Sequence, residues 1–299
     1  MQRFASLAMT FLLVIFSLTP CGADDSLEKI KSNADIGDAQ AQYTLGAKYF
    51  TGNGVPKNCD EAVKWFTKAA ERGNAFAQYD LGLMYATGTD ISQDYAKAHK
   101  WWRMAAENGS LSAQNSLGLL FAKGFGTPAN SAEAAKWWRK AAEHDMPAAQ
   151  NNLGSLYATG QGVSKDLSKA IKLYTASAEQ GYVEAIYNLG YLYLTGQGVS
   201  QNNTEAVKLY KKAAEKGFGM AQYNLGLLYY TGQGVPQDFI RAYAYWRLTA
   251  PKIPQANQNL QILKRGLTSA QITEGEKAAD ALRKKSFDNT AQPSFPALP

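Results

Sequence analysis

Few residues of the sequence are of the types that carry out covalent chemistry, and their spacing decides what they could do. Ser26 and Lys29 form a Ser-x-x-Lys pattern, in which a lysine activates a serine nucleophile against a β-lactam or cell-wall substrate. Neither Lys-Thr-Gly nor Ser-Asp-Asn follows it, and so short a pattern is common by chance. The two histidines, His99 and His144, have no partner placed for catalysis. We therefore expect a protein that is not an enzyme.

Metal and nucleotide chemistry are disfavoured as well. The 299 residues include two cysteines and two histidines, which leaves no cluster with the spacing of a metal site. Gly-x-Gly segments such as Gly52–Gly54 lack the third glycine of a dinucleotide loop and the Gly-Lys-Ser/Thr ending of a phosphate loop. The sequence predicts no cofactor.

Residues 1–23 have the pattern of a secretory signal peptide. Arg3 supplies the positive charge, an apolar run covers residues 7–18, and Ala23 ends a cleavage site of small residues. The run is shorter than the ~20 residues that span a bilayer, so a membrane anchor is the weaker alternative, as is a lipid on Cys21. We expect a periplasmic or secreted protein with no stable membrane insertion after cleavage.

A Leu-Gly pair recurs six times at a spacing of 36 residues, without an insertion, which defines one array of repeats rather than two domains. The pairs begin at Leu45, Leu81, Leu117, Leu153, Leu189 and Leu225. The expected repeats are 39–74, 75–110, 111–146, 147–182, 183–218 and 219–254. Around this 39–254 array we expect the signal peptide 1–23, an N-terminal capping helix 24–38, C-terminal capping helices 255–285 and a disordered tail 286–299.

Each repeat contains two amphipathic helical patterns joined by a turn, which reads Gly-x-Gly at Gly52–Gly54, Gly196–Gly198 and Gly232–Gly234. In the first unit, Ala41, Leu45 and Tyr49 lie on one face of the first pattern. The turn glycines predict a left-handed helix cap and a chain reversal, and the glycine of each Leu-Gly pair predicts a notch for close packing. An aromatic column follows the second patterns, and we interpret it as core rather than as a ligand box. It consists of Phe66, Trp102, Trp138, Tyr174, Tyr210 and Trp246.

The repeat columns also suggest how single residues are used. Loss of the leader would leave Cys59 as the one thiol, at a place that other repeats fill with Tyr95, Ser131, Leu167, Asn203 and Phe239. That tolerant column favours a half-buried apolar role for Cys59 over a reactive thiol. His99 stands in a mostly aliphatic column and is interpreted as a partly buried substitution.

These units resemble the Sel-1-like repeat (SLR) family, a branch of the tetratricopeptide-like helical solenoids. The resemblance rests on two motifs in register in all six units, of which Ala221–Val235 and Lys211–Gly217 are examples. It implies an all-α fold, a right-handed α/α superhelical solenoid of six 36-residue helix-turn-helix repeats with capping helices. It also implies a scaffold for protein or peptide binding, and exported bacterial members of the family are associated with envelope functions or host contact.

Charge placement argues against nucleic acid as a partner. The formal net charge of +6 is mild for a chain of this length. The first-helix patterns hold two basic and two acidic residues, whereas lysines such as Lys136 and Lys140 belong to the second helices. A groove that binds a phosphate backbone needs a basic stripe, which this pattern does not provide.

The residue before each Leu-Gly pair is polar, and it cannot share the apolar face of the first helix. The resemblance implies that this position faces a concave surface, where an asparagine can donate to and accept from a peptide backbone. Neighbouring tyrosines could flank it. The candidate peptide-binding residues are Asp80, Ser116, Asn152, Asn188, Asn224, Tyr187, Tyr191 and Tyr223. The alternative is that the asparagines only form hydrogen bonds between successive repeats.

These observations favour a non-enzymatic adaptor or scaffold, in the cell envelope or secreted, with host interaction as one setting. Its partner would be a protein or an extended peptide. An envelope enzyme or binder acting on peptidoglycan or β-lactams is the alternative, and a purely structural spacer is a third hypothesis.

Overall fold

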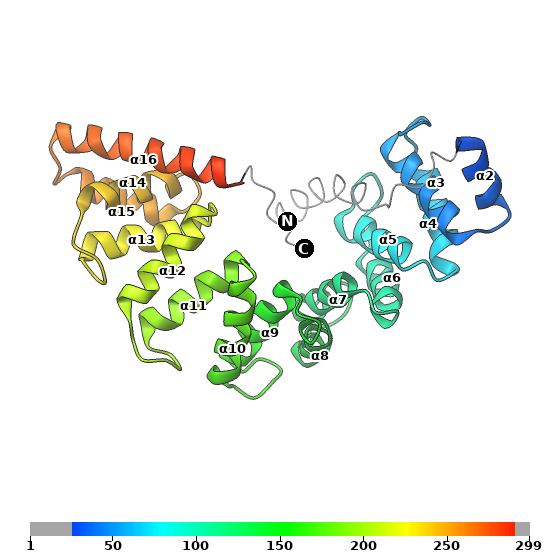
Figure 1. Cartoon of the computed structure of the whole chain (residues 1–299), viewed down its shortest axis with the longest axis horizontal. Coiled ribbons are helices and arrows are strands. Elements are labelled where there is room, and N and C mark those ends of the chain that lie inside the picture. Colours follow the sequence, from blue (N-terminus) through cyan, green and yellow to red (C-terminus); the bar gives the residue numbers. More distant parts are fainter. Residues whose placement is uncertain (1–25, 291–299) are drawn as a thin grey trace. The chain divides into compact units, whose positions relative to one another are not determined.

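The computed structural model describes residues 26–290, so the predicted signal peptide and residues 291–299 lie outside the described residues. Within 26–290 the chain forms fifteen helices and no strand (Figure 1), which confirms the predicted all-α repeat fold. The described residues form two compact units. One runs to His144 and includes 161–163, and the other comprises 145–160 and the chain from Ser164 onward.

Each repeat supplies two antiparallel helices. The first helices are α3 (Ala39–Thr51), α5 (Ala75–Thr87), α7 (Leu111–Lys123), α9 (Pro147–Thr159), α11 (Val183–Thr195) and α13 (Gly219–Thr231). The second helices are α4 (Cys59–Glu71), α6 (Tyr95–Glu107), α8 (Ser131–Ala142), α10 (Leu167–Glu179), α12 (Asn203–Glu215) and α14 (Phe239–Thr249). The helix α2 (Leu27–Asp35) precedes the array, and α15 (Pro254–Lys264) and α16 (Ser269–Thr290) follow it.

Glycine and Asx side chains delimit the helices in every repeat. The first helices end at glycines with φ between 68° and 78°, a left-handed conformation that strains other residues. Each second helix begins after an Asn or Asp whose side chain accepts a hydrogen bond from a backbone N–H of the first turn. These caps are Asn58, Asp94, Asn130, Asp166, Asn202 and Asp238. The predicted glycine caps are thereby confirmed.

The glycine of each Leu-Gly pair lies against the aromatic residue of its own repeat. A Cβ added to Gly82 would lie 2.3 Å from Cδ1 of Trp102, and one added to Gly226 would lie 2.4 Å from Nε1 of Trp246. The indole N–H of Trp102 also donates to the carbonyl oxygen of Tyr79 at 3.0 Å. All six members of the aromatic column are 5% exposed or less, which confirms that the column is core.

A buried glutamine ties most first helices to the preceding helix. The Nε2 atom of Gln78 donates to the carbonyl oxygen of Ala70 at 2.9 Å. Gln42, Gln114 and Gln222 make the same bond to Ala34, Ala106 and Ala214. Each bond gives a second donor to a carbonyl at a helix C-terminus, which also accepts from the backbone N–H of the glycine three residues later. Successive repeats are therefore joined by hydrogen bonds as well as by apolar packing.

The last helix differs from the prediction at its end. We expected it to stop near Lys285, with a disordered tail from residue 286, but α16 continues to Thr290. No glycine or proline occurs between Lys285 and Pro293, so the sequence contains no helix-stop signal at the predicted boundary.

The glycine–aromatic contact predicts different costs for the same substitution in two repeats. Gly226→Ala should lower the free energy of unfolding by about 1–3 kcal/mol, because the new methyl overlaps the Trp246 indole. Gly154→Ala should change it by less than about 1 kcal/mol. Its Cβ would lie 3.1 Å from Tyr174, and the higher helix propensity of alanine offsets that contact.

Urea unfolding of the two variants measures both changes. A second substitution, Trp246→Phe, should restore part of the stability lost in Gly226→Ala. Equal losses for the two alanine variants would contradict the steric explanation.

Candidate peptide-binding surface

The polar residues before the Leu-Gly pairs lie one on each first helix, and we call them the polar column. They are Thr44, Asp80, Ser116, Asn152, Asn188 and Asn224. Thr44, Asp80 and Ser116 belong to the first compact unit, and the three asparagines to the second. Ser116 is buried, with 6% of its area exposed, whereas the others are partly buried. Ser116 therefore offers the least surface to a partner.

The polar column forms hydrogen bonds between successive repeats. Asn188 Nδ2 donates to Asn151 Oδ1 at 2.9 Å, and Asn224 Nδ2 donates to the Tyr187 hydroxyl at 3.4 Å. In the first unit the Tyr43 hydroxyl donates to Asp80 Oδ2 at 3.1 Å. Each bond joins residues 37 positions apart. Hydrogen bonding between successive repeats, which the sequence left as the alternative role, is therefore one role of these residues.

These bonds do not use the whole polar side chain. Asn188 and Asn224 engage Nδ2, and within residues 26–285 no hydrogen bond to Oδ1 of Asn188 is found, while the Asn224 amide also interacts with the Tyr210 hydroxyl. The two residues come from neighbouring first helices, α11 and α13, of the same unit. An extended backbone presents N–H donors at regular intervals, and successive amide oxygens can accept from them.

The three candidate tyrosines differ in how much of the ring is free. Tyr191 is 44% exposed and lies on α11. Tyr187 is partly buried, and its ring packs against Tyr210 and Phe218 at centroid distances of 5.4 and 5.1 Å. Tyr223 is also partly buried, and its carbonyl oxygen accepts from the Trp246 indole at 3.3 Å. Tyr191 is therefore the aromatic residue best placed to contact a partner.

Asp80 is the one acidic member of the polar column. Burial raises the pKa of its carboxyl to about 7, and the hydrogen bond from Tyr43 opposes that shift only in part. The same burial, together with the Asp80 charge, raises the pKa of the Tyr43 phenol. Near neutral pH this position therefore exchanges a proton, which the corresponding asparagines cannot do.

The residues considered for catalysis have structural surroundings. The Ser26 hydroxyl accepts a hydrogen bond from the Lys29 backbone N–H at 3.4 Å and caps α2. His99 is partly buried, as predicted, with its ring edge-on to Phe121 at 5.1 Å, and burial lowers its pKa. Cys59 is half-buried, as expected, and burial raises the pKa of its thiol. Among residues 26–290, no group of three His, Cys, Asp or Glu side chains is arranged to hold a metal ion.

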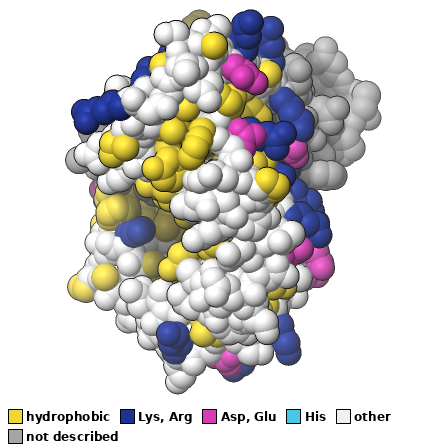
Figure 2. All heavy atoms as spheres, turned by 90° about the vertical axis from the view of Figure 1, so that its left-hand side faces the viewer, with side chains coloured by type: hydrophobic (Ala, Val, Ile, Leu, Met, Phe, Trp, Pro, Cys, Tyr) yellow, Lys and Arg dark blue, Asp and Glu magenta, His cyan; other side chains and the backbone are white. Residues whose placement is uncertain are grey.

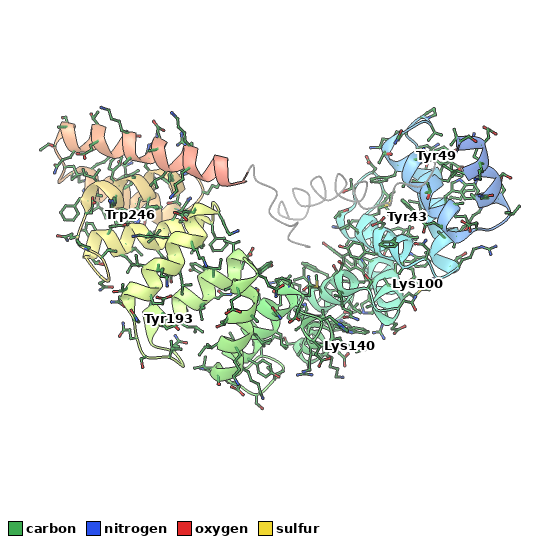
Figure 3. All side chains as sticks on the ribbon, in the orientation of Figure 1. Tyr43, Tyr49, Lys100, Lys140, Tyr193 and Trp246 are labelled. Atoms are coloured by element: carbon green, nitrogen blue, oxygen red, sulfur yellow. The ribbon has the colours of Figure 1, made fainter. Side chains whose placement is uncertain are left out.

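Lysines on the second helices cover tryptophan rings. The ammonium groups of Lys68, Lys100 and Lys140 lie 3.8, 4.9 and 4.4 Å from the ring centroids of Trp65, Trp101 and Trp137. Lys100 and Lys140 are labelled on α6 and α8 in Figure 3. These cations shield core aromatics, and they do not line the polar column.

The comparison with known proteins agrees with this architecture. Sel1 repeats are matched over residues 39–74, 75–110, 111–146, 147–182, 183–218 and 219–250. The chain belongs to the Sel1 repeat family. Sel1 repeats are helical scaffolds that mediate protein binding.

Two solved structures show the likeness in detail. A protective antigen of uropathogenic Escherichia coli that displays an SLR fold is 36% identical, with a TM-score of 0.75 over 89% of this chain. The chain spans 57% of the length of that antigen. A Sel1 repeat protein from Oxalobacter formigenes is 32% identical, with a TM-score of 0.67 over 82% of this chain and 94% of its own. No curated protein matches the sequence.

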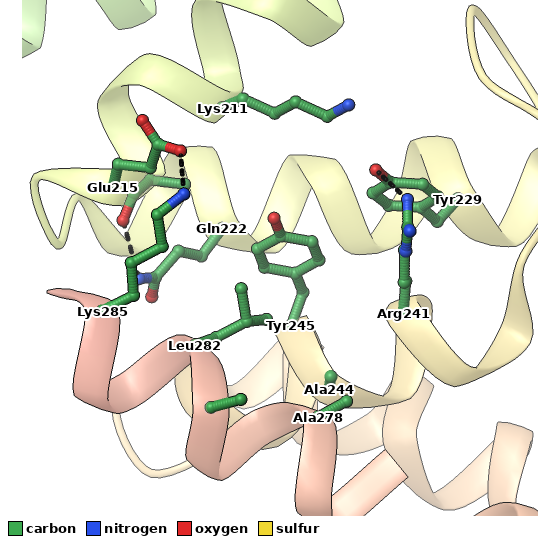
Figure 4. A pocket seen from close by; sticks show the side chains of 12 residues that line it. Lys211, Glu215, Gln222, Tyr229, Arg241, Ala244, Tyr245, Ala278, Leu282 and Lys285 are labelled. Carbon is green, nitrogen blue, oxygen red and sulfur yellow. Dashed lines mark hydrogen bonds and ion pairs between the residues drawn. The ribbon is translucent and has the colours of Figure 1, made fainter. Parts of the chain in front are cut away.

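Sequence reasoning missed a pocket of about 380 Å³ in the second unit (Figure 4). Side chains from α12, α13, α14 and α16 line it, among them Lys211, Tyr229, Arg241 and Tyr245. One signal was present, because Tyr245 brings a hydroxyl to a column that is otherwise apolar. The other members of that column are Trp65, Trp101, Trp137, Leu173 and Leu209.

The raised pKa of Asp80 predicts a specific pH dependence of stability. The pKa of about 7 exceeds the ordinary value of 3.8, so the protonated carboxyl is favoured in the folded state. Its contribution to the free energy of unfolding is present below about pH 4 and is lost as the pH rises to about 7. Asp80→Asn keeps an inter-repeat donor, as in the Asn224–Tyr187 pair, and removes the charge. At pH 7.5 it should be more stable than the parent by on the order of 2 kcal/mol, an amount reduced for partial exposure, with little difference near pH 4.

Chemical unfolding at the two pH values measures this difference. Asp60→Asn, which removes a carboxyl at an exposed position on α4, is the control for the loss of one charge. A pH-independent effect of Asp80→Asn would show that the Asp80 carboxyl titrates normally.

Proposed function

We propose that this chain is a non-enzymatic adaptor whose polar column binds an extended peptide or an extended segment of a partner protein. The observation that carries the proposal is that the Nδ2 atoms of Asn188 and Asn224 hold the repeats together, while the part of the chain with described side chains shows no hydrogen bond to Asn188 Oδ1. Tyr191, exposed on the same helix as Asn188, supplies apolar contact area.

We also propose that the protein acts in the cell envelope or after secretion, where it contacts a host. The apolar run of residues 7–18, with Arg3 before it and small residues after it, supports export. The likeness to a protective antigen of uropathogenic Escherichia coli supports exposure to a host. None of the helices in residues 26–290 combines the length and apolar content that crossing a membrane requires.

The competing hypothesis of an envelope enzyme has no support in the described residues. Its nucleophile would be Ser26, whose hydroxyl caps α2. Incubation of the purified protein with a chromogenic β-lactam and with peptidoglycan tests it. Saturable turnover that disappears in Ser26→Ala would replace the adaptor proposal with the enzymatic one.

Substitution of the two amides tests the proposed surface. A partner is first captured from envelope fractions and host-cell extracts, and its affinity is then measured by calorimetry. Asn188→Ala with Asn224→Ala should weaken binding about five- to hundredfold, because each lost hydrogen bond costs about 0.5–1.5 kcal/mol.

Two controls separate binding from folding. Asn151→Ala removes the bond between repeats without touching Asn188 Oδ1, so it should lower stability and leave the affinity within about twofold. Lys136→Ala with Lys140→Ala changes the second helices and should also leave binding intact. If the lysine changes abolish binding while the asparagine changes do not, the partner binds the second-helix face.

A further inference from the structure

The pocket of the second unit exists because α16 covers part of the last repeat. A Cβ added to Gly275 of α16 would lie 2.5 Å from Tyr243 of α14, so only glycine allows this close approach. Glu276 accepts from the Tyr243 hydroxyl at 2.7 Å and pairs with Arg247 Nε at 3.1 Å. The α16 helix also contacts α12. A groove along the second helices thereby gains a wall from α16.

Tyr245 directs its hydroxyl into this pocket. The residue is 9% exposed, and no hydrogen bond to its hydroxyl is present among residues 26–285, whose side chains the structure describes. Burial raises the pKa of the phenol, so the hydroxyl stays protonated and is available as a donor. Figure 4 shows the ring between Lys285 and Arg241, with the hydroxyl on the side where Lys211 lies. The hydroxyl is therefore placed to donate to an acceptor that enters the pocket.

The charged groups of the pocket are mostly cationic. Lys211, Arg241 and Lys285 face one carboxylate, Glu215. Lys285 pairs with Glu215 at 2.6 Å, and Arg241 donates to the Tyr229 hydroxyl at 3.2 Å and pairs with Asp238. Lys211 forms no ion pair within the part of the chain that the structure describes, and its ammonium lies 5.8 Å from the Tyr229 ring. A cation and a neutral donor are therefore both free to meet one anionic group.

The remaining lining is apolar. The rings of Tyr229 and Tyr245 stack at a centroid distance of 5.9 Å and an interplanar angle of 12°. Ala244, Ala278 and Leu282 complete the apolar surface. On the face of the second unit in Figure 2, apolar side chains likewise lie beside lysine and arginine side chains. A ligand that matches this lining carries an apolar body as well as an anionic group.

We propose that this pocket binds a carboxylate attached to an apolar or aromatic group, with Tyr245 and Lys211 as the donors to the carboxylate. The apolar group lies against the Tyr229–Tyr245 stack and Leu282. Two sources share this chemistry, the C-terminal residue of a peptide and a free aromatic acid. A volume of about 380 Å³ suits a single residue or a small acid.

The geometry favours a carboxylate over a phosphate. A phosphate is held by several cations or by convergent backbone N–H groups. Here one of the three cations is paired with Glu215, and a second is already bonded to Asp238 and Tyr229. One ammonium and one hydroxyl match the acceptors of a singly charged carboxylate.

Ligand-observed NMR titration of the full chain tests the pocket with four probes. N-acetyl-phenylalanine mimics the end of a peptide, and N-acetyl-phenylalaninamide is its neutral counterpart. We expect the acid to bind at least about tenfold more tightly than the amide. The other probes are 3-phenylpropionate, a free acid, and inorganic phosphate, which should not compete.

Variants identify the donors. Tyr245→Phe keeps the ring stack and should weaken binding of N-acetyl-phenylalanine about two- to tenfold, without changing binding of the amide. Lys211→Met should weaken it about three- to tenfold. Lys212→Met changes the next residue of α12, which does not line the pocket, and should have no effect.

The results separate the two sources and the two sites. Tighter binding of N-acetyl-phenylalanine than of 3-phenylpropionate assigns the pocket to peptide ends, and the reverse order assigns it to free acids. Equal binding of acid and amide, no binding by either acid, competition by phosphate, or an unchanged affinity in Tyr245→Phe overturns the proposal. Asn188→Ala and Asn224→Ala lie outside this pocket and should not alter acid binding, so its failure leaves the polar-column proposal standing.

Discussion

The fit of one aromatic ring against one glycine sets the geometry of every repeat. In five of the six units, a Cβ at the glycine would lie within 3.0 Å of that ring, so the two helices of a pair approach at a distance that only glycine permits. The indole N–H then reaches a carbonyl of the first helix, as in the Trp138–Asn115 bond of 3.0 Å. This contact fixes how each first helix lies against its second helix, and the proposed binding surface depends on that arrangement.

The polar column serves two purposes with one side chain. The amide nitrogens of Asn188 and Asn224 join successive repeats, and their amide oxygens are the groups proposed to meet a partner, whereas Asn152 Oδ1 accepts from Asn151 Nδ2 at 3.4 Å. A surface of this kind cannot change its ligand contacts without some effect on the stability of the array. Asp80 differs from the asparagines because its carboxyl titrates. Burial raises the pKa of this carboxyl to about 7, whereas an amide at the same position carries no charge at any of these pH values.

Much of the fold was predictable because the contacts within a repeat are local and occur six times. The Leu-Gly spacing, the aromatic column and the turn glycines all pointed to paired helices, and the structure agrees at each place. The pairing of Asn188 with Asn151 was predicted only as one of two alternatives, since a column of amides suits either use. The pocket was not predicted, because it depends on where α16 packs, and Gly275 against Tyr243 is a contact that occurs once. The predicted end of α16 near Lys285 was also wrong, because the helix continues to Thr290. The polar composition of the following residues indicated a tail, although no glycine or proline stops the helix there.

The Asn and Asp caps of the second helices and the glycine caps of the first helices lie in the same repeat as the helices that they delimit. Every second helix starts from a cap within its own 36 residues, and every first helix ends at a glycine of the same segment. The N-cap of each first helix is the last residue of the preceding segment, as Asn74 is for α5, so duplication or loss of a whole segment would insert or remove a complete pair of helices and keep this junction between neighbours. The helix α16 packs on α14 of the last repeat, so it would stay with the final copy when the number of repeats before it changes.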